Sequence, residues 1–273
     1  MAKGDAVNAL CRMTGLNRAG FYRWRLPRQA MPVEMELRDE LQKVALESPS
    51  YGYRRITAEL HRRGFDANHK RVLRLMRADN LLCVRRRPFV VTTDSRHTLP
   101  VYPNLARGLT TTAINQLWVA DITYIRLRTE FVYLSVVLDA FSRRVIGWAL
   151  GRTLEAQLPC SALRMALQTR QPKPGFVHHS DRGVQYASLD YTALLDQHQA
   201  NISMSRKGNP YDNAACESFM KTLKYEEVYR NDYRDLTEAQ SMIGEFLEQV
   251  YNQHRLHSAL GYVPPAEFEK DAS

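Results

Sequence analysis

Residues 117–125 read LWVADITYI, and this run of β-branched and aromatic side chains decides the fold of the larger part of the chain. Two similar runs follow closely, FVYLSVVLD over residues 131–139 and RVIGWAL over residues 144–150. Runs of this kind, separated by short polar gaps, are typical of neighbouring β-strands. The three stretches therefore predict a three-stranded meander.

Helices and short strands alternate after the meander. Apolar spacing predicts short strands over 176–179 and 202–204, and helices over 158–168, 189–198 and 213–225. A polar loop over residues 206–210 precedes the last helix. The expected order is βββαβαβα, which favours an α/β class with a five-stranded mixed sheet flanked by helices.

The part of the chain before the sheet is expected to be helical. Apolar residues at helical spacing predict helices over 34–46, 54–63 and 68–79, the last two separated by a break at 64–66. A further pair of short helices over residues 6–24 favours a helix-turn-helix.

Positive charge is concentrated in this helical part. Residues 1–100 carry 20 Lys and Arg against 10 Asp and Glu, whereas residues 101–273 carry 18 against 19. Backbone phosphates of nucleic acid are the usual partner of such a density of basic residues. The alternative is a solvated basic face without a ligand. The candidate DNA-binding residues here are Arg54, Arg55, Lys70, Arg71 and Arg74.

The length of 273 residues allows two domains. The expected division is a basic helical DNA-binding region over 1–91, a linker over 92–113, a catalytic core over 114–230 and a helical extension over 231–273. No apolar run reaches the roughly 18 residues of a membrane helix, and no secretory signal is evident. We therefore expect a soluble, cytoplasmic protein.

Three carboxylates stand at unusual places in this pattern. Asp121 interrupts an apolar strand, Asp181 directly follows another strand, and Glu217 lies inside a predicted helix. Taken singly, Asp181 could be a turn or capping residue and Glu217 an exposed helix residue. Together they could converge at one end of the sheet. Divalent cations such as Mg²⁺ relieve the repulsion between such groups, and two ions about 3.5–4 Å apart support in-line phosphoryl transfer.

The spacing and the local motifs resemble known families. The 35 residues between Asp181 and Glu217 resemble the signature of retroviral-type integrases. The chain also closely resembles the second-frame (OrfB) transposases of bacterial insertion sequence family three, through residues 51–56, 118–124, 138–144, 179–186, 209–219, 251–255 and 260–265. One departure from this resemblance is Val184, where a small polar residue is common.

The resemblance implies a ribonuclease-H-like catalytic core in which Asp121, Asp181 and Glu217 match the catalytic and metal-binding triad. It implies two Mg²⁺ ions, with Mn²⁺ as a substitute. The implied reaction nicks the ends of the protein's own element and joins the 3′-hydroxyl to another strand. The implied partners are double-stranded DNA (terminal inverted repeats and target), further copies of the chain and a first-frame (OrfA) protein.

Two lysines follow Glu217 on the same predicted helix face. Lys221 and Lys224 lie at i+4 and i+7, so both should point toward whatever the carboxylates hold. We interpret them as contacts to the phosphates of the terminal DNA. The alternative is an ordinary surface ion pair between Glu217 and Lys221, which contributes only ~0.5 kcal/mol.

The sequence also offers other candidate sites and other functions. His178 and His179 fit buried, hydrogen-bonded strand residues better than metal ligands. A DNA-binding regulator with a silent α/β half would not need Asp121, so Asp121→Asn tests that alternative. A nuclease that hydrolyses DNA without joining strands is a third possibility, which the sequence leaves open.

Overall fold

A computed structural model describes most of the chain, namely residues 32–81, 100–206 and 213–272, together with residues 7, 11–15, 17 and 19. Parts of the predicted elements lie outside the described residues. These are most of the helix-turn-helix expected over 6–24, the first part of the linker over 92–113 and most of the loop over 206–210.

Five strands form one mixed sheet in the order β3-β2-β1-β4-β5. The first three form an antiparallel meander, and β4 and β5 run parallel to β1. The strands are β1 (Leu117–Arg126), β2 (Phe131–Asp139), β3 (Val145–Gly151), β4 (Val177–Ser180) and β5 (Asn201–Met204). The predicted five-stranded mixed sheet is confirmed, and each predicted strand agrees with the observed one to within one residue at either end.

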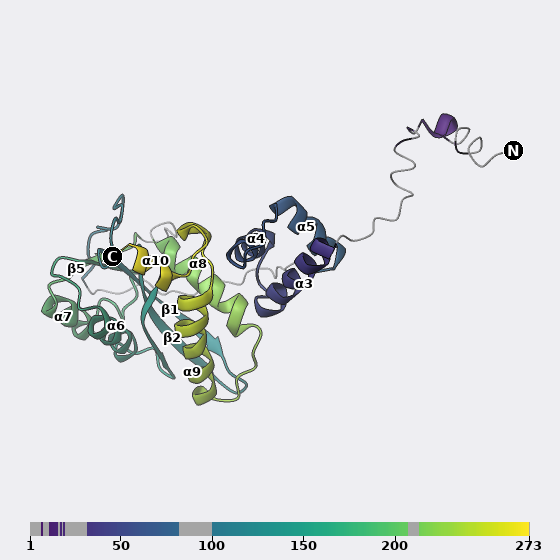
Figure 1. Cartoon of the computed structure of the whole chain (residues 1–273). Helices are drawn as coiled ribbons and strands as arrows, with labels where there is room; N and C mark the ends of the chain where they lie inside the picture. The colour runs from purple at the N-terminus through teal and green to yellow at the C-terminus, as the bar shows by residue number, and fades with distance from the viewer. Residues whose placement is uncertain are drawn as a thin grey trace.

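Helices cover both faces of this sheet (Figure 1). One face packs against α6 (Gln157–Arg170) and α7 (Leu189–Gln197), and the other against α8 (Ala214–Leu223) and α9 (Leu236–Glu245). The approach of α6 is close, because a Cβ built on Gly147 of β3 would lie 2.2 Å from the carbonyl oxygen of Ala162. Glycine is therefore required at this position of β3.

Side chains of β1 alternate between these two faces, as the period of a strand demands. Trp118 and Ala120 belong to the core cluster under α6 and α7, whereas Leu117 and Val119 belong to the cluster under α8 and α9. By the same alternation Asp121 lies on the α8 face. The strand pattern thus directs this carboxylate toward the helix that carries Glu217.

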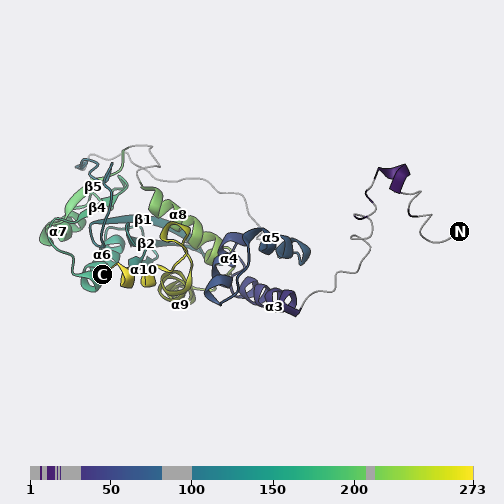
Figure 2. The same ribbon diagram turned by 45° about the horizontal axis from the view of Figure 1, so that its top comes forward.

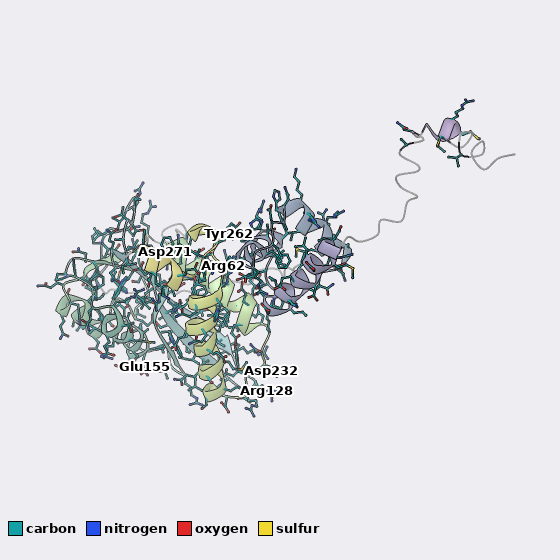
Figure 3. All side chains as sticks on the ribbon, in the orientation of Figure 1. Arg62, Arg128, Glu155, Asp232, Tyr262 and Asp271 are labelled. Atoms are coloured by element: carbon teal, nitrogen blue, oxygen red, sulfur yellow. The ribbon has the colours of Figure 1, made fainter. Side chains whose placement is uncertain are left out.

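The C-terminal segment is part of the same core. After α8 the chain continues through a π-type turn η2 (Lys224–Val228), and after α9 through η3 (Phe246–His254), η4 (Ser258–Leu260) and α10 (Pro265–Asp271). Arg128 after β1 pairs with Asp232 before α9 at 2.9 Å (Figure 3). Asn252 accepts the Val145 N–H at 3.0 Å and donates to the Val145 carbonyl at 2.9 Å, so its side chain extends the edge of the sheet.

The helical part upstream forms a second, smaller core. Its helices are α3 (Pro32–Glu47), α4 (Tyr53–Arg62) and α5 (His69–Ala78), which lie to one side of the sheet in both Figure 1 and Figure 2. Asn68 caps α5 by accepting the Lys70 N–H at 2.8 Å. The buried side chains include Leu41, Ile56, Leu60, Val72 and Met76.

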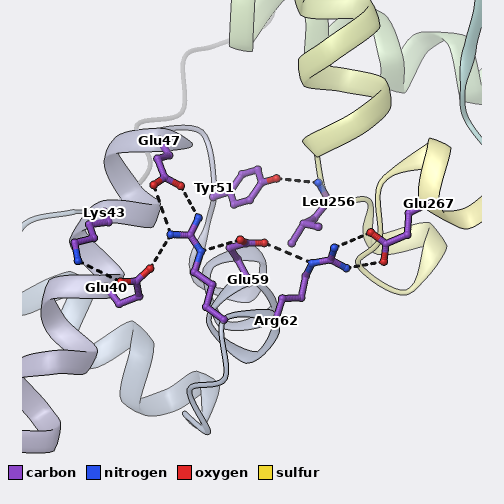
Figure 4. A network of polar contacts seen from close by, with 9 residues as sticks. Glu40, Lys43, Glu47, Tyr51, Glu59, Arg62, Leu256 and Glu267 are labelled. Atoms are coloured by element: carbon purple, nitrogen blue, oxygen red, sulfur yellow. Dashed lines mark hydrogen bonds and ion pairs between the residues drawn. The ribbon is translucent and has the colours of Figure 1, made fainter.

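The C-terminal segment also docks on this helical part (Figure 4). Leu256 completes the small core, and its N–H donates to the Tyr51 hydroxyl at 2.8 Å. Arg62 of α4 pairs with Glu267 of α10 at 2.6 Å. Within the described parts of the chain, no helix is both long and apolar enough to cross a membrane.

Candidate active site

The parallel pairing of β1 with β4 places Asp121 beside Asp181. The register pairs Leu117 with Val177 and Val119 with His179. Continued by two residues, it brings Asp121 opposite Asp181, the first residue after β4. Two carboxylates from different parts of the sequence therefore come together at one point on neighbouring strands.

Backbone N–H groups orient both carboxylates. The Ile122 N–H donates to Oδ1 of Asp121 at 2.8 Å, and the Gly183 N–H donates to Oδ1 of Asp181 at 2.9 Å. A Cβ on Gly183 would lie 3.0 Å from that same Oδ1 atom and 3.0 Å from Oε1 of Gln185. A side chain at residue 183 would therefore press on the side chains of Asp181 and Gln185, which would have to shift slightly.

Glu217 is brought to the site by α8, where it lies in the first turn. The buried Asn213, directly before this helix, donates through Nδ2 to the carbonyl oxygen of Ala120 at 3.3 Å. That carbonyl belongs to the residue before Asp121. A side-chain hydrogen bond thus fixes the start of the helix that carries Glu217 to the strand that carries Asp121.

The three carboxylates act on one another electrostatically. Burial raises the pKa of Asp121 to about 7, with further increases from the charges of Asp181 and Glu217 and an opposing effect of Lys224. The ionised carboxylate is therefore destabilised, and a cation would relieve it. Three oxygen donors at a partly buried position match the preference of Mg²⁺, which also keeps waters and substrate phosphates among its ligands.

The donor set is not a closed metal cage. Among the described residues, no three His, Cys, Asp or Glu side chains are already grouped closely enough to hold an ion by themselves. An open set of carboxylates suits a cation that takes part of its shell from water and substrate. The residues present therefore fit a divalent cation by their chemistry.

The two lysines after Glu217 differ in their surroundings. Lys224 is partly buried, with Nζ 4.7 Å from the centre of the Tyr124 ring. Burial lowers its pKa, and the charge of Asp121 opposes that effect, which places Lys224 near the carboxylates. Lys221 is exposed. No ion pair joins Glu217 to Lys221 in the described chain.

The predicted DNA-binding residues upstream fall in two places. Lys70, Arg71 and Arg74 lie on the outer side of α5, away from its buried residues, and Arg74 pairs with Glu34 at 3.1 Å. Arg54 is exposed on α4, and its guanidinium lies 5.0 Å from the Tyr53 ring centre. Of these four residues, Arg54, Lys70 and Arg74 are exposed and Arg71 is half-buried, and together they are called the basic residues of α4 and α5.

Arg55 lies elsewhere, since it lines a cavity between α4, α8 and the C-terminal segment. Its neighbour Arg54 is exposed, so two adjacent residues of the predicted set face different surroundings. The sequence pattern did not distinguish them.

The two adjacent strand histidines are buried and hydrogen-bonded. His179 lies between the hydroxyls of Ser203 at 2.8 Å and Ser205 at 3.0 Å. His178 contacts the Tyr191 hydroxyl at 2.9 Å, and burial lowers its pKa to about 3. This is the structural role expected for these histidines.

Several residues near the carboxylates were not singled out from the sequence. Asn213 is one, and Tyr186 and Cys216 are two others, both fully or almost fully buried. Burial is the main cause of their raised pKa values, and the charges of Asp121 and Asp181 contribute. All three lie within the motifs over residues 179–186 and 209–219, which also contain Asp181 and Glu217. Their nearness to these carboxylates in the sequence is the signal that could have identified them.

Comparison with known proteins agrees with this architecture. Residues 111–210 and 198–265 match two families described as integrase core domain, and residues 32–89 match an HTH-like domain. The chain is 38% identical to the insertion element IS600 uncharacterized 31 kDa protein of Shigella sonnei, over 96% of this chain and 97% of that one. It is 36% identical to transposase InsF for insertion sequence IS3A of Escherichia coli (strain K12), over 97% and 94%.

Solved structures of similar shape are more distant. A chain of the simian T-cell lymphotropic virus intasome aligns over 84% of this chain and 74% of its own length, with a TM-score of 0.49 and 16% identity. The integrase catalytic core domain of HTLV-2 aligns over 57% and 97%, with a TM-score of 0.45 and 15% identity.

Fold and sequence relatives together define the class, a DDE-type polynucleotidyl transferase with a ribonuclease-H-like core preceded by a helix-turn-helix region. The chain belongs to the family of IS3-type insertion-sequence transposases. The expected fold class and transposase function are thereby confirmed.

Proposed function

We propose that Asp121, Asp181 and Glu217 are the catalytic triad of this transposase and hold two divalent cations, Mg²⁺ or Mn²⁺. The observation that carries the proposal is the alignment of Asp121 with Asp181 across β1 and β4, with α8 tied to β1 through Asn213. When bound, such ions would activate the attacking oxygen and stabilise the leaving oxygen of the phosphodiester.

The residues of the chain have distinct tasks in this proposal. The three carboxylates provide the negative charge that the cations need, and backbone N–H groups keep Asp121 and Asp181 aimed at one place. Lys224, partly buried beside Tyr124, and Lys221 on the same helix contact phosphates of the DNA strand at the carboxylates. The DNA is thus positioned for cleavage and for joining of its 3′-hydroxyl to another strand.

We further propose that the basic residues of α4 and α5, namely Arg54, Lys70, Arg71 and Arg74, bind the terminal inverted repeats of the element. In this division residues 1–91 recognise DNA, 92–113 link, 114–230 catalyse and 231–273 support the core. The working form is proposed to be a homo-oligomer on DNA in the bacterial cytoplasm at the nucleoid, with a first-frame protein as partner or fusion.

The test is strand transfer by the purified protein on a labelled duplex that carries the element's own end, with Mg²⁺ or Mn²⁺. Wild type is compared with Glu217→Gln, which keeps the shape of the side chain and removes its charge. Joined products that form only with the wild-type protein and only when metal is present would support the proposal. Cleavage without joining would favour a nuclease, and full activity of Glu217→Gln would remove Glu217 from the triad.

A further inference from the structure

A second cavity lies along α8, on a different side of the helix from Glu217. It has a volume of about 440 Å³ and is lined by Ala214, Ser218 and Thr222 of this helix. On an α-helix these three residues form one stripe, which is turned by roughly 100° from the stripe of Glu217 and Lys221. The lining of the cavity includes none of the three carboxylates, although the cavity borders their site through Asn213.

Arginines from three distant parts of the chain line this cavity. Arg55 comes from α4, Arg143 from the turn between β2 and β3, and Arg255 from the segment after η3. Arg255 is paired with Glu226 through two contacts of 2.8 Å. In the described residues, Arg55 and Arg143 have no carboxylate partner, so the cavity carries an excess of positive charge.

The turn that presents Arg143 is firmly built. Arg143 itself has the left-handed backbone conformation, with φ of 62°, which is unusual for a residue with a side chain. The buried carboxylate of Asp139 accepts N–H groups from Asn115 at 2.6 Å, Phe141 at 2.9 Å and Ser142 at 3.1 Å. The guanidinium of Arg143 is thus carried by an ordered turn.

One ring nitrogen of a buried histidine in the same cavity lacks a hydrogen-bond partner. His257 is 8% exposed, and its Nε2 atom is buried without a hydrogen bond to any described residue. Burial lowers the pKa of His257 to about 3, with further decreases from the charges of Arg255, Arg55 and Arg143. The imidazole is therefore neutral at pH 7. Of the three arginines around it, Arg255 is paired with Glu226, whereas Arg55 and Arg143 form no ion pair with a described residue.

We propose that this cavity binds a phosphate group, with Arg55 and Arg143 as its charged donors and His257 beside them in the lining. Arginine guanidinium groups match the oxygens of a phosphate in pairs, and the negative charge of the phosphate would offset part of the excess positive charge. The hydroxyls of Ser218 and Ser258 in the lining add further donors.

The place of the cavity favours the backbone of DNA as the source of this phosphate, an assignment that rests on the proposed function. Helix α4, which carries Arg55, belongs to the basic helical part, whereas Arg143 belongs to the sheet. A phosphate held by both would fix the position of the DNA-binding part relative to the start of α8. The site would therefore position duplex DNA and take no part in the chemistry.

The first arm of the test measures binding of inorganic phosphate to the full chain. Histidines are labelled with ¹⁵N, and phosphate replaces chloride at constant ionic strength while the His257 ring signal, assigned by its absence in His257→Gln, is followed. We expect the His257 signal to shift with phosphate until it saturates. The apparent Kd for phosphate should rise about tenfold or more in Arg143→Gln and in Arg55→Gln. Arg164→Gln, which changes an exposed arginine of α6, is the matched control and should bind as wild type.

A His257 signal that does not move would show that phosphate does not bind there. A signal that moves equally in all variants would show an adventitious ion only, and either outcome would overturn the site. The second arm adds the duplex with the element's end, without divalent metal, and follows binding by fluorescence anisotropy. A bound duplex that reproduces the His257 shift supports the DNA backbone as source, and a bound duplex that leaves His257 unchanged overturns it. Phosphate binding without any duplex binding would keep the site and would contradict the proposed function instead.

Discussion

The side-chain amide of Asn213 donates a hydrogen bond to the main-chain carbonyl of Ala120 at 3.3 Å, and both groups are buried. The contact joins the residue before α8 to the residue before Asp121. Small movements of α8 would move Glu217 relative to Asp121, so the position of one carboxylate against the other depends on this bond.

Asn213→Ala should therefore separate activity from folding. It leaves the Ala120 carbonyl without its partner, which costs about 1–3 kcal/mol of stability. Strand transfer should fall by about a hundredfold, since displacement of a catalytic group by an ångström has effects of that order. Asn201→Ala, which removes an exposed bond to the Gly175 carbonyl, is the control. Equal activity of the two variants would show that the bond does not position Glu217.

Asp121→Asn should abolish strand transfer and yet increase stability without metal. The buried Asp121 carboxylate is destabilised by burial and by its acidic neighbours, and a neutral amide removes that repulsion. In EDTA the variant should unfold at a higher temperature than wild type. Addition of Mg²⁺ should raise the melting temperature of wild type alone, and a matching rise in the variant would exclude Asp121 as a ligand.

Gly183→Ala should lower activity with little effect on folding. The added methyl group would lie 3.0 Å from Oδ1 of Asp181, so the carboxylate must move. We expect a loss of about tenfold or more in strand transfer and a change in unfolding free energy below about 1 kcal/mol. Gly52→Ala is the control, because nothing lies within 4 Å of a Cβ there. A fully active Gly183→Ala variant would contradict the proposed role of Asp181.

Tyr51→Phe should loosen the helical part from the sheet more than Glu267→Gln does. The phenylalanine leaves the buried Leu256 N–H without its acceptor, a loss of about 1–3 kcal/mol. The pair of Arg62 with Glu267 is exposed on both sides and contributes about 0–1 kcal/mol. Limited proteolysis and thermal unfolding of both variants would measure the difference. A larger effect of Glu267→Gln would show that the ion pair, and not the Tyr51 hydroxyl, is the stronger contact.

The buried His178 should make the protein sensitive to acid. Its pKa is about 3 in the folded chain against 6.5 for an ordinary histidine, so the unfolded chain binds more protons between these values. Stability should therefore fall as the pH falls from 6.5 toward 3. Denaturant unfolding at several pH values should show a weaker dependence in His178→Gln than in wild type. The exposed His254→Gln should behave as wild type.

The sequence predicted the strands well, and it made three carboxylates candidates for a site, for a physical reason. Runs such as residues 131–139 combine β-branched side chains with polar gaps, and that local pattern determines strand limits. Asp121 and Asp181 were conspicuous because each carboxylate interrupts or ends an apolar strand.

The surroundings of Arg55 could not be predicted in this way. They depend on contacts with a segment about 200 residues later, since 205 positions separate Tyr51 from Leu256. Local spacing shows that α4 has a polar side, and it does not show which part of that side another segment covers. The cavity with Arg143 and His257 was missed for the same reason.

Helices α3 to α5 dock on Leu256 and Glu267, and this contact affects how the chain folds during translation. Helices α3 to α5 are translated early and can form a small folded unit while the rest is still being made. Their docking surface around Leu256 is translated about 200 residues later. Until then the basic helices lack this anchor, and they become joined to the sheet only after Leu256 and Glu267 have been made.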